Sequence, residues 1–170
     1  PAAAAKRGGA DAVSLINTIT SIMGVDPDTL TMTPATGGYG SHGGYCGPAV
    51  KPIALNMVSQ IGRAPETAGL PISGIGGVGS WRDALDYIAL GAGNVQVCTA
   101  AMVYGFKIVQ DMADGLANWM DDKGFATLDD FCGKALPTVT DWQSLNLNAI
   151  SKAQIDQGSC IQCGRCHIAC

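Results

Sequence analysis

Short apolar runs alternate with amphipathic segments along the first two thirds of this chain. Residues 10–17 (ADAVSLIN) are mostly apolar and lead into the polar pair Asn17-Thr18, which is typical of a buried strand. Residues 71–77 (PISGIGG) predict a second short strand that runs into a glycine turn, and residues 94–99 (NVQVCT) predict a third. A Thr-rich connection and the glycine-rich stretch 37–47 come after the first strand.

Three amphipathic segments predict helices between and after these strands. Pro48 suits the first turn of a helix, where its missing N–H costs nothing. The apolar stripe of this helix consists of Val50, Ala54, Met57, Val58 and Ile61. Ser80 and Asp83 resemble a capping box that starts the second helix. We expect that helix to end at Gly91 and to bury Ala84, Leu85 and Ile88.

The third helix is predicted from Val103 to Asp122. Its apolar face comprises Phe106, Val109, Met112, Leu116 and Met120, and its polar face Asp111, Asp114, Asn118 and Asp121. Strand and helix therefore alternate three times, which indicates parallel βα units in an α/β fold. Three such units cannot close a barrel. The pattern weakens over 123–159, where 127–135 predicts a short helix and the rest a connecting arm.

Composition narrows the function classes. The 170 residues are 47% hydrophobic and 14% charged, which argues against disorder and suits one ordinary domain. A net charge of −4 without a dense Lys/Arg cluster argues against nucleic-acid binding, and no apolar run is long enough to span a membrane. The start, PAAAAKRGGA, does not resemble a signal peptide. Seven cysteines then favour metal binding or catalysis in the reducing cytoplasm.

The last eleven residues, CIQCGRCHIAC, carry the most specific motif. Cys160, Cys163, Cys166 and Cys170 have the C-x2-C-x2-C-x3-C spacing of bacterial ferredoxins, in which thiolates hold a [4Fe–4S] cluster. A zinc knuckle or redox thiols are the alternatives, although zinc sites usually separate two ligand pairs more widely. The motif predicts an electron-transfer protein. We expect His167, inside the motif, to pack and not to bind metal.

Other candidate site residues follow the predicted strands. Gly76, Gly77 and Thr99 stand where the last two loops of a β/α barrel commonly bind a phosphate, although a plain tight turn is the better explanation of the glycine pair taken alone. Asn17 and Thr18 stand at the end of the first strand, and an ordinary cap or turn is their alternative. Cys46 could be a catalytic acid but fits better as a small residue in a tight loop, and His42 is expected to be solvated.

These motifs together resemble a known family. ADAVSLINT, GGYCGPAVKPIAL, PISGIGGV, GNVQVCTA and CIQCGRCHIAC occur in the order found in NAD-dependent dihydropyrimidine dehydrogenases, in particular the bacterial catalytic subunit. The resemblance implies the C-terminal portion of a dihydroorotate-dehydrogenase-like TIM (β/α)8 barrel over 1–122, with its last three βα units and FMN. An arm over 123–159 and the truncated start of a 4Fe–4S ferredoxin-like domain over 160–170 would follow.

The resemblance also implies an activity and a set of sites. Uracil or thymine would be reduced to the 5,6-dihydro form, with electrons from NADH through an FAD-carrying partner subunit, iron–sulfur clusters and FMN, in an oligomer. Asn17 and Thr18 match the substrate-binding pair. The positions that match FMN contacts are Gly47, Gly76, Gly77, Cys98 and Thr99, and the four cysteines of the final motif match cluster ligands. Two alternatives remain: a dihydroorotate dehydrogenase-like flavoenzyme and a pure iron–sulfur electron carrier.

The chain lacks parts that the resemblance leads us to expect. About five barrel strands would precede residue 1, together with a loop cysteine that donates the proton and a lysine that contacts FMN. A second cysteine run would follow residue 170. The catalytic residue is therefore unknown, and we expect the 170 residues alone to be inactive, because open sheet edges leave strand N–H and C=O groups unpaired.

Overall fold

The three predicted strands form one parallel sheet. The computed structural model describes residues 1–149 and 154–166. In it, β1 (Val13–Leu15), β6 (Ile72–Ile75) and β7 (Asn94–Gln96) lie side by side in the order β1-β6-β7. Ser14 pairs with Ser73, and Ser73 pairs with Asn94. Each strand is shorter than the apolar run that predicted it, but the backbone N–H of Ile16 extends the pairing with a 2.7 Å hydrogen bond to the Ile75 carbonyl.

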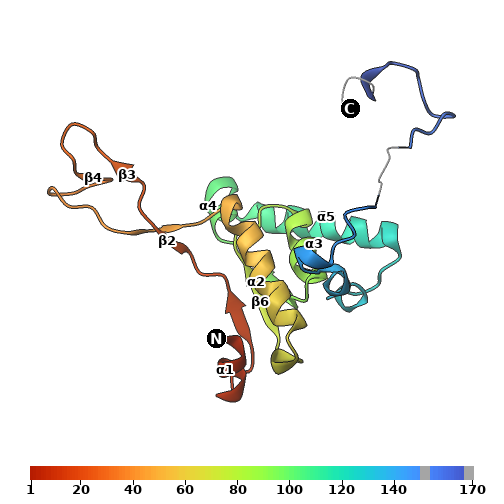
Figure 1. The fold of residues 1–170 in the computed structure, drawn as a ribbon, viewed down its shortest axis with the longest axis horizontal. Helices are drawn as coiled ribbons and strands as arrows, with labels where there is room; N and C mark the ends of the chain where they lie inside the picture. The colour runs from red at the N-terminus through yellow and green to blue at the C-terminus, as the bar shows by residue number, and fades with distance from the viewer. Residues whose placement is uncertain (150–153, 167–170) are drawn as a thin grey trace. The chain divides into compact units, whose positions relative to one another are not determined.

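As the alternating pattern predicted, a helix lies between β1 and β6 and another between β6 and β7. The turn η1 (Pro48–Val50) leads into α2 (Lys51–Arg63), and α3 (Trp81–Ala89) connects β6 to β7. Helices α2 and α3 both contact the sheet, as Figure 1 shows around β6. A short helix α1 (Ala2–Arg7) precedes β1, and η2 (Pro65–Thr67) follows α2. No helix in residues 1–149 and 154–166 is long and apolar enough to cross a membrane.

One apolar core joins the sheet to these helices. Its buried members are Leu15, Ala54, Val58, Ile72, Val78, Ala84, Tyr87, Ala92 and Met112. Ala54, Val58, Ala84 and Ile88 are buried as predicted, whereas Met57 is exposed. Leu85 is only half-buried, and Tyr87 is the fully buried residue of α3. The prediction missed Tyr87 because a residue with a polar hydroxyl scores poorly in an apolar stripe.

The predicted helix 103–122 is two helices. Helix α4 (Thr99–Tyr104) ends at Gly105, whose φ of +81° is outside the helical range, and α5 (Lys107–Lys123) begins two residues later. The break leaves Phe106 at the N-cap of α5 and 87% exposed, so its assignment to the apolar face of one continuous helix was wrong. Met112 is buried as expected, and Val109 is exposed.

The connection between β1 and α2 contains strands that the sequence did not predict. Strand β2 (Ile19–Ser21) pairs antiparallel with β5 (Gly43–Tyr45), and β3 (Gly24–Val25) pairs antiparallel with β4 (Met32–Thr33). These strands have two or three residues each, with no apolar alternation to reveal them.

Residues 124–139 belong to the first unit of the chain and pack at the end of α3. The structure divides into Pro1–Val139 and Thr140–Cys170. Backbone N–H groups of Gly133 and Ala135 donate to carbonyls of Ile88 and Ala89 at the end of α3. The predicted short helix over 127–135 is replaced by the 3₁₀ turn η3 (Leu128–Asp130), and η4 (Leu136–Thr138) follows. In the second unit, η5 (Trp142–Ser144) is a further 3₁₀ turn.

Candidate functional site

A cavity of about 580 Å³ lies where the three parallel strands end. Because parallel strands bring their carboxyl ends to one edge of a sheet, the loops after β1, β6 and β7 meet there. The seven residues predicted to bind substrate or cofactor all line this cavity: Asn17, Thr18, Gly47, Gly76, Gly77, Cys98 and Thr99. The structure therefore brings together residues that are up to 82 positions apart in the sequence.

The glycine turn after β6, residues 76–79, requires glycine at its first two positions. Gly76 and Gly77 have φ angles of +130° and +68°, which other residues rarely adopt. A Cβ on Gly77 would lie 2.7 Å from the Gly47 carbonyl oxygen and 2.9 Å from Cβ of Lys51. A Cβ on Gly76 would lie 2.8 Å from Cγ2 of Ile16. The turn thus packs directly against the start of α2, and no side chain fits between them.

This turn presents free hydrogen-bond donors. Within the described residues, the backbone N–H groups of Gly76, Gly77 and Val78 donate to no carbonyl or side chain. Successive backbone N–H groups in a turn with positive φ can bind an anion such as a phosphate. The Thr99 hydroxyl, which also lines the cavity, has only a weak 3.5 Å contact with the Cys46 sulfur, which leaves it available as a further donor.

Asn17 and Thr18 add polar side chains to the lining of the cavity. The Asn17 side-chain oxygen accepts a 2.8 Å hydrogen bond from the Thr18 backbone N–H. That contact orients the carboxamide, and its nitrogen makes no hydrogen bond to any described residue. Thr18 packs on Gly44 of β5, where an added Cβ would collide with the Thr18 side chain. An exposed amide and hydroxyl of this kind can recognise a polar ring.

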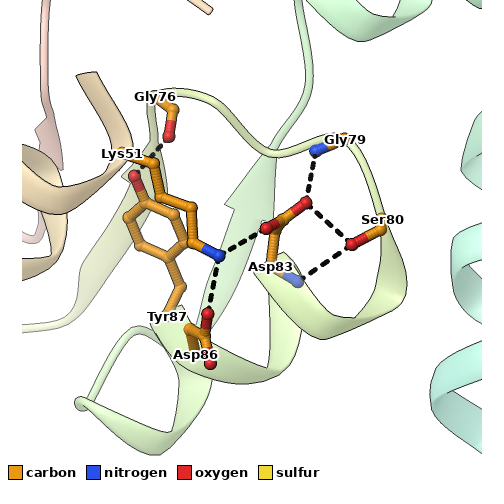
Figure 2. Close-up of polar contacts among 7 residues, drawn as sticks. All are labelled: Lys51, Gly76, Gly79, Ser80, Asp83, Asp86 and Tyr87. Atoms are coloured by element: carbon orange, nitrogen blue, oxygen red, sulfur yellow. Dashed lines mark hydrogen bonds and ion pairs between the residues drawn. The ribbon is translucent and has the colours of Figure 1, made fainter. Parts of the chain in front are cut away.

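A polar cluster, made of Lys51, Ser80, Asp83, Asp86 and Tyr87, lies beside the glycine turn (Figure 2). The Lys51 ammonium contacts a carboxylate oxygen of Asp83 and lies 2.6 Å from Oδ2 of Asp86. Asp83 Oδ2 accepts from the Gly79 N–H at 3.0 Å and from the Ser80 hydroxyl at 2.8 Å. Ser80 also caps α3, as predicted, by accepting from the Asp83 N–H, but the Asp83 carboxylate accepts from the Gly79 N–H and not from the Ser80 N–H, so the capping box is incomplete.

Hydrogen bonds within the cluster keep Lys51 and Asp83 charged. Burial acts to lower the pKa of Lys51, but its hydrogen bonds to Asp83 and Asp86 outweigh burial and raise that pKa. Burial acts to raise the pKa of Asp83, but hydrogen bonds from Lys51, Ser80 and Gly79 lower it overall. The Tyr87 hydroxyl donates a 2.6 Å hydrogen bond to the Gly76 carbonyl, and burial, followed by the Asp83 charge, raises its pKa to about 12.

Gln96 lines the cavity and was not predicted as a site residue. Its side-chain nitrogen donates to the hydroxyls of Ser14 and Ser73 at 2.7 and 2.8 Å. These residues come from three adjacent strands and share one face of the sheet. The alternation of polar residues along β1, β6 and β7 could have revealed this face, but the apolar residues between them dominated the strand prediction.

The cysteines of the final motif belong to the second unit of the chain or lie outside the described residues, whereas the candidate Cys46 lines the cavity. Cys160, Cys163 and Cys166 are free thiols, and residues 154–166 contain no group of three side chains gathered for a metal ion. The backbone N–H of Gln162 approaches the Cys160 sulfur at 3.4 Å. Cys170 and His167 lie outside the described residues. His42 is exposed, as expected.

The sequence itself matches known proteins over this same region. Residues 2–120 match the dihydroorotate dehydrogenase family. The chain is 43% identical over 169 residues to the Escherichia coli NAD-dependent dihydropyrimidine dehydrogenase subunit PreA, covering 99% of this chain and 41% of PreA. It is 38% identical over 143 residues to chloroplastic dihydropyrimidine dehydrogenase (NADP(+)) of Arabidopsis thaliana, covering 82% of this chain and 34% of that protein.

A further relative is named for a different activity. The chain is 38% identical over 133 residues to the catalytic subunit of dihydroorotate dehydrogenase B (NAD(+)) from Pyrococcus horikoshii, covering 78% of this chain and 41% of that subunit. The chain thus spans less than half the length of these relatives. The family match covers well over half of the chain and implies a TIM-barrel-like α/β flavoenzyme fold, in agreement with the three parallel βα units. The chain belongs to the dihydroorotate dehydrogenase family.

Proposed function

We propose that the protein containing this chain reduces uracil or thymine to the 5,6-dihydropyrimidine, with FMN bound in the cavity at the strand ends. One observation carries the proposal: seven residues expected on sequence grounds to bind FMN and the pyrimidine, six of them after the ends of the three parallel strands and Gly47 at the start of η1, line a single cavity of about 580 Å³. A volume in this range suits a cofactor with a small substrate.

The residues present fit the FMN phosphate and ring. The N–H groups of Gly76 and Gly77 and the hydroxyl of Thr99 would bind the phosphate, because these donors have no strong partner of their own. Cys98 would lie beside the phosphate with Thr99, and Gly47 would border the remainder of the cofactor. When bound, FMN supplies the hydride chemistry that reduction of a carbon–carbon double bond requires. The protein's part is to bind, orient and exclude water.

The pyrimidine would bind at Asn17 and Thr18. The Asn17 amide nitrogen can donate to a ring carbonyl, and its oxygen is already held by the Thr18 N–H, which fixes the orientation of the carboxamide. The Thr18 hydroxyl can donate or accept. These two side chains would therefore position the ring and discriminate among pyrimidines by hydrogen bonding.

Electrons would reach the cavity through iron–sulfur clusters. Cys160, Cys163, Cys166 and Cys170 would hold a [4Fe–4S] cluster, since four thiolates at this spacing are the donor set that such clusters require. Positive φ angles at Gln162 and Gly164 let the chain turn tightly between these ligands. An NADH- and FAD-binding partner subunit would supply the electrons in an oligomeric complex. The need for reduced thiols favours the cytoplasm.

A dihydroorotate dehydrogenase activity is the second candidate, favoured by the family match and the Pyrococcus relative. The lengths of the matches support the pyrimidine reductase. Similarity to PreA extends over 99% of the chain, which takes in the cysteine motif, whereas similarity to the dihydroorotate dehydrogenase subunit extends over 78%. A pure electron carrier without FMN is the third candidate, and it does not account for the cavity at the strand ends.

A turnover assay on the full-length protein, with its partner subunit, separates these candidates. We expect FMN to copurify and uracil or thymine to be reduced by NADH, with dihydroorotate inactive. Asn17→Ala should raise KM for uracil and leave FMN bound, and Asn118→Ala on the exposed face of α5 is the matched control. Turnover of dihydroorotate alone would favour the second candidate, and absence of FMN the third.

A further inference from the structure

Lys51 is the one cation among the described residues that line the cavity, and its charge already has partners. Its ammonium contacts Asp83 and lies 2.6 Å from Asp86 Oδ2, and both carboxylates come from α3. One ammonium therefore faces two carboxylates. A phosphate arriving at the cavity would not find an unpaired lysine there.

Two side chains of α3 hold the backbone of the glycine turn at both ends. The Tyr87 hydroxyl donates to the Gly76 carbonyl at 2.6 Å, and Asp83 Oδ2 accepts from the Gly79 N–H at 3.0 Å. Both contacts tie the turn to α3, as Figure 2 shows. Lys51 then ties α3 to the first turn of α2. Because the carbonyl of Gly76 is bound by Tyr87, the peptide that follows it has a fixed orientation.

Close contacts with the start of α2 also restrain the glycine turn. Gly77 sits so close to the Gly47 carbonyl and to Cβ of Lys51 that it has no room for a side chain. The turn is therefore fixed by hydrogen bonds from α3 and by direct contact with the start of α2. Its N–H groups at positions 76–78 are left without partners among the described residues. A donor array held rigidly in this way binds an anion without reorganising.

We propose that Lys51, Asp83 and Tyr87 are positioning residues for the FMN phosphate, and that Lys51 is not its counter-ion. The three side chains hold the glycine turn in the conformation whose backbone N–H groups bind the phosphate. This inference rests on the proposed function, because it takes FMN as the ligand of the cavity.

Asp83 distinguishes this role from direct binding by Lys51. If Lys51 were the phosphate ligand, Asp83 would compete for its ammonium, and Asp83→Asn would leave FMN binding unchanged or strengthen it. If the two residues hold the turn together, Asp83→Asn weakens FMN binding just as Lys51→Met does. The two roles thus predict opposite directions for one substitution.

The experiment measures dissociation constants of FMN and riboflavin by flavin fluorescence on the full-length protein depleted of flavin. We expect Lys51→Met and Asp83→Asn each to weaken FMN binding about tenfold, because either change breaks a hydrogen-bonded ion pair. Riboflavin, which lacks the phosphate, should be affected much less. The double variant should be no weaker than the weaker single variant, because both remove the same contact. Asp111→Asn on the exposed face of α5 is the control for charge.

Two conservative variants keep the test decisive if Lys51→Met or Asp83→Asn fails to fold. Lys51→Arg should retain FMN binding, because a guanidinium can also bridge two carboxylates. Tyr87→Phe keeps the ring and removes only the hydroxyl, and should weaken FMN more than riboflavin. Unchanged or tighter FMN binding by Asp83→Asn, or unchanged binding by every variant, overturns the inference and leaves the proposed function standing. Absence of FMN binding by the unmodified protein overturns both.

Discussion

The hydroxyl of Tyr87 donates a 2.6 Å hydrogen bond to the backbone carbonyl of Gly76. The two residues belong to different elements: Tyr87 lies in α3, and Gly76 begins the turn after β6. The Tyr87 ring also occupies the space above Gly74, where a Cβ would collide with it. One buried side chain therefore sets both the distance of α3 from the sheet and the orientation of the turn at the cavity.

Removing this hydroxyl should lower stability. Tyr87→Phe leaves the Gly76 carbonyl without its partner while the ring still fills the core, so we expect the free energy of unfolding to fall by about 1–3 kcal/mol. Tyr104→Phe, at an exposed tyrosine, should change it by less than about 0.5 kcal/mol. Chemical denaturation of both variants measures the difference. Equal effects would show that the Tyr87 hydroxyl adds nothing to the fold.

Tyr87 also makes the free energy of unfolding depend on pH in the alkaline range. Its pKa is about 12 in the folded protein and near 10.0 in the unfolded chain, so between these values the unfolded state has lost the proton and the folded state keeps it. The unfolded state then binds fewer protons, and stability falls as pH rises from 10 to 12. Tyr87→Phe should remove this part of the slope. A variant whose stability falls as steeply as that of the unmodified protein contradicts the assignment.

Gly77 should tolerate alanine worse than a glycine with similar backbone angles elsewhere. Gly77 and Gly69 have φ of +68° and +74°, but only Gly77 has atoms in the space that a Cβ would take. We expect Gly69→Ala to cost about 1–2 kcal/mol from backbone strain alone. Gly77→Ala should cost more and also abolish FMN binding, because the turn must move. Thermal unfolding and flavin content compare them, and equal losses of flavin would contradict the prediction.

A cysteine of the final motif should be needed for iron, and a cysteine elsewhere should not. Cys163→Ala in the full-length protein should lower iron and acid-labile sulfide content and abolish NADH-dependent turnover, while FMN stays bound. Cys132, whose thiol faces the Ala92 carbonyl, is the matched control, and Cys132→Ala should leave iron content unchanged. If Cys163→Ala retains all of its iron, the motif does not bind the cluster.

Residues 124–139 should contribute to the stability of the first unit. Phe131 is buried, with its ring centroid 5.1 Å from Trp119 and 5.6 Å from Phe125. Phe131→Ala should lower the free energy of unfolding by about 3–5 kcal/mol, because it leaves a cavity in this aromatic group. Trp142→Ala, at an exposed tryptophan of the second unit, should have little effect. Similar unfolding curves for both variants would show that the segment is only a connection.

The three strands of the parallel sheet and helices α2 and α3 were predicted correctly from local signals. Buried strands and their following helices leave a clear apolar period, and the Ser80–Asp83 cap has its own local signature. Five cavity residues could be named because parallel strands place their ends together, whereas Gly47 and Cys98 were named only through the family resemblance. These features depend on neighbours in the sequence or on one general rule of sheet topology.

The missed features depend on distant residues or on backbone angles. Lys51 contacts Asp83, 32 positions away, and Gln96 contacts Ser14, 82 positions away. No local sequence pattern predicts either contact. Gly105 interrupts a continuous helical period through its positive φ, which the apolar pattern of 103–122 does not encode. The pairing of β2 with β5 was missed because three-residue strands carry too little alternation to be recognised.

The most direct test of the account is an experimental structure of the full-length protein with FMN. We predict that phosphate oxygens lie about 2.7–3.2 Å from the backbone nitrogens of Gly76 and Gly77 and from the Thr99 hydroxyl. Lys51 should still contact Asp83 in that complex. A phosphate bound elsewhere, or one bound mainly by the Lys51 ammonium with Asp83 released, would contradict the account.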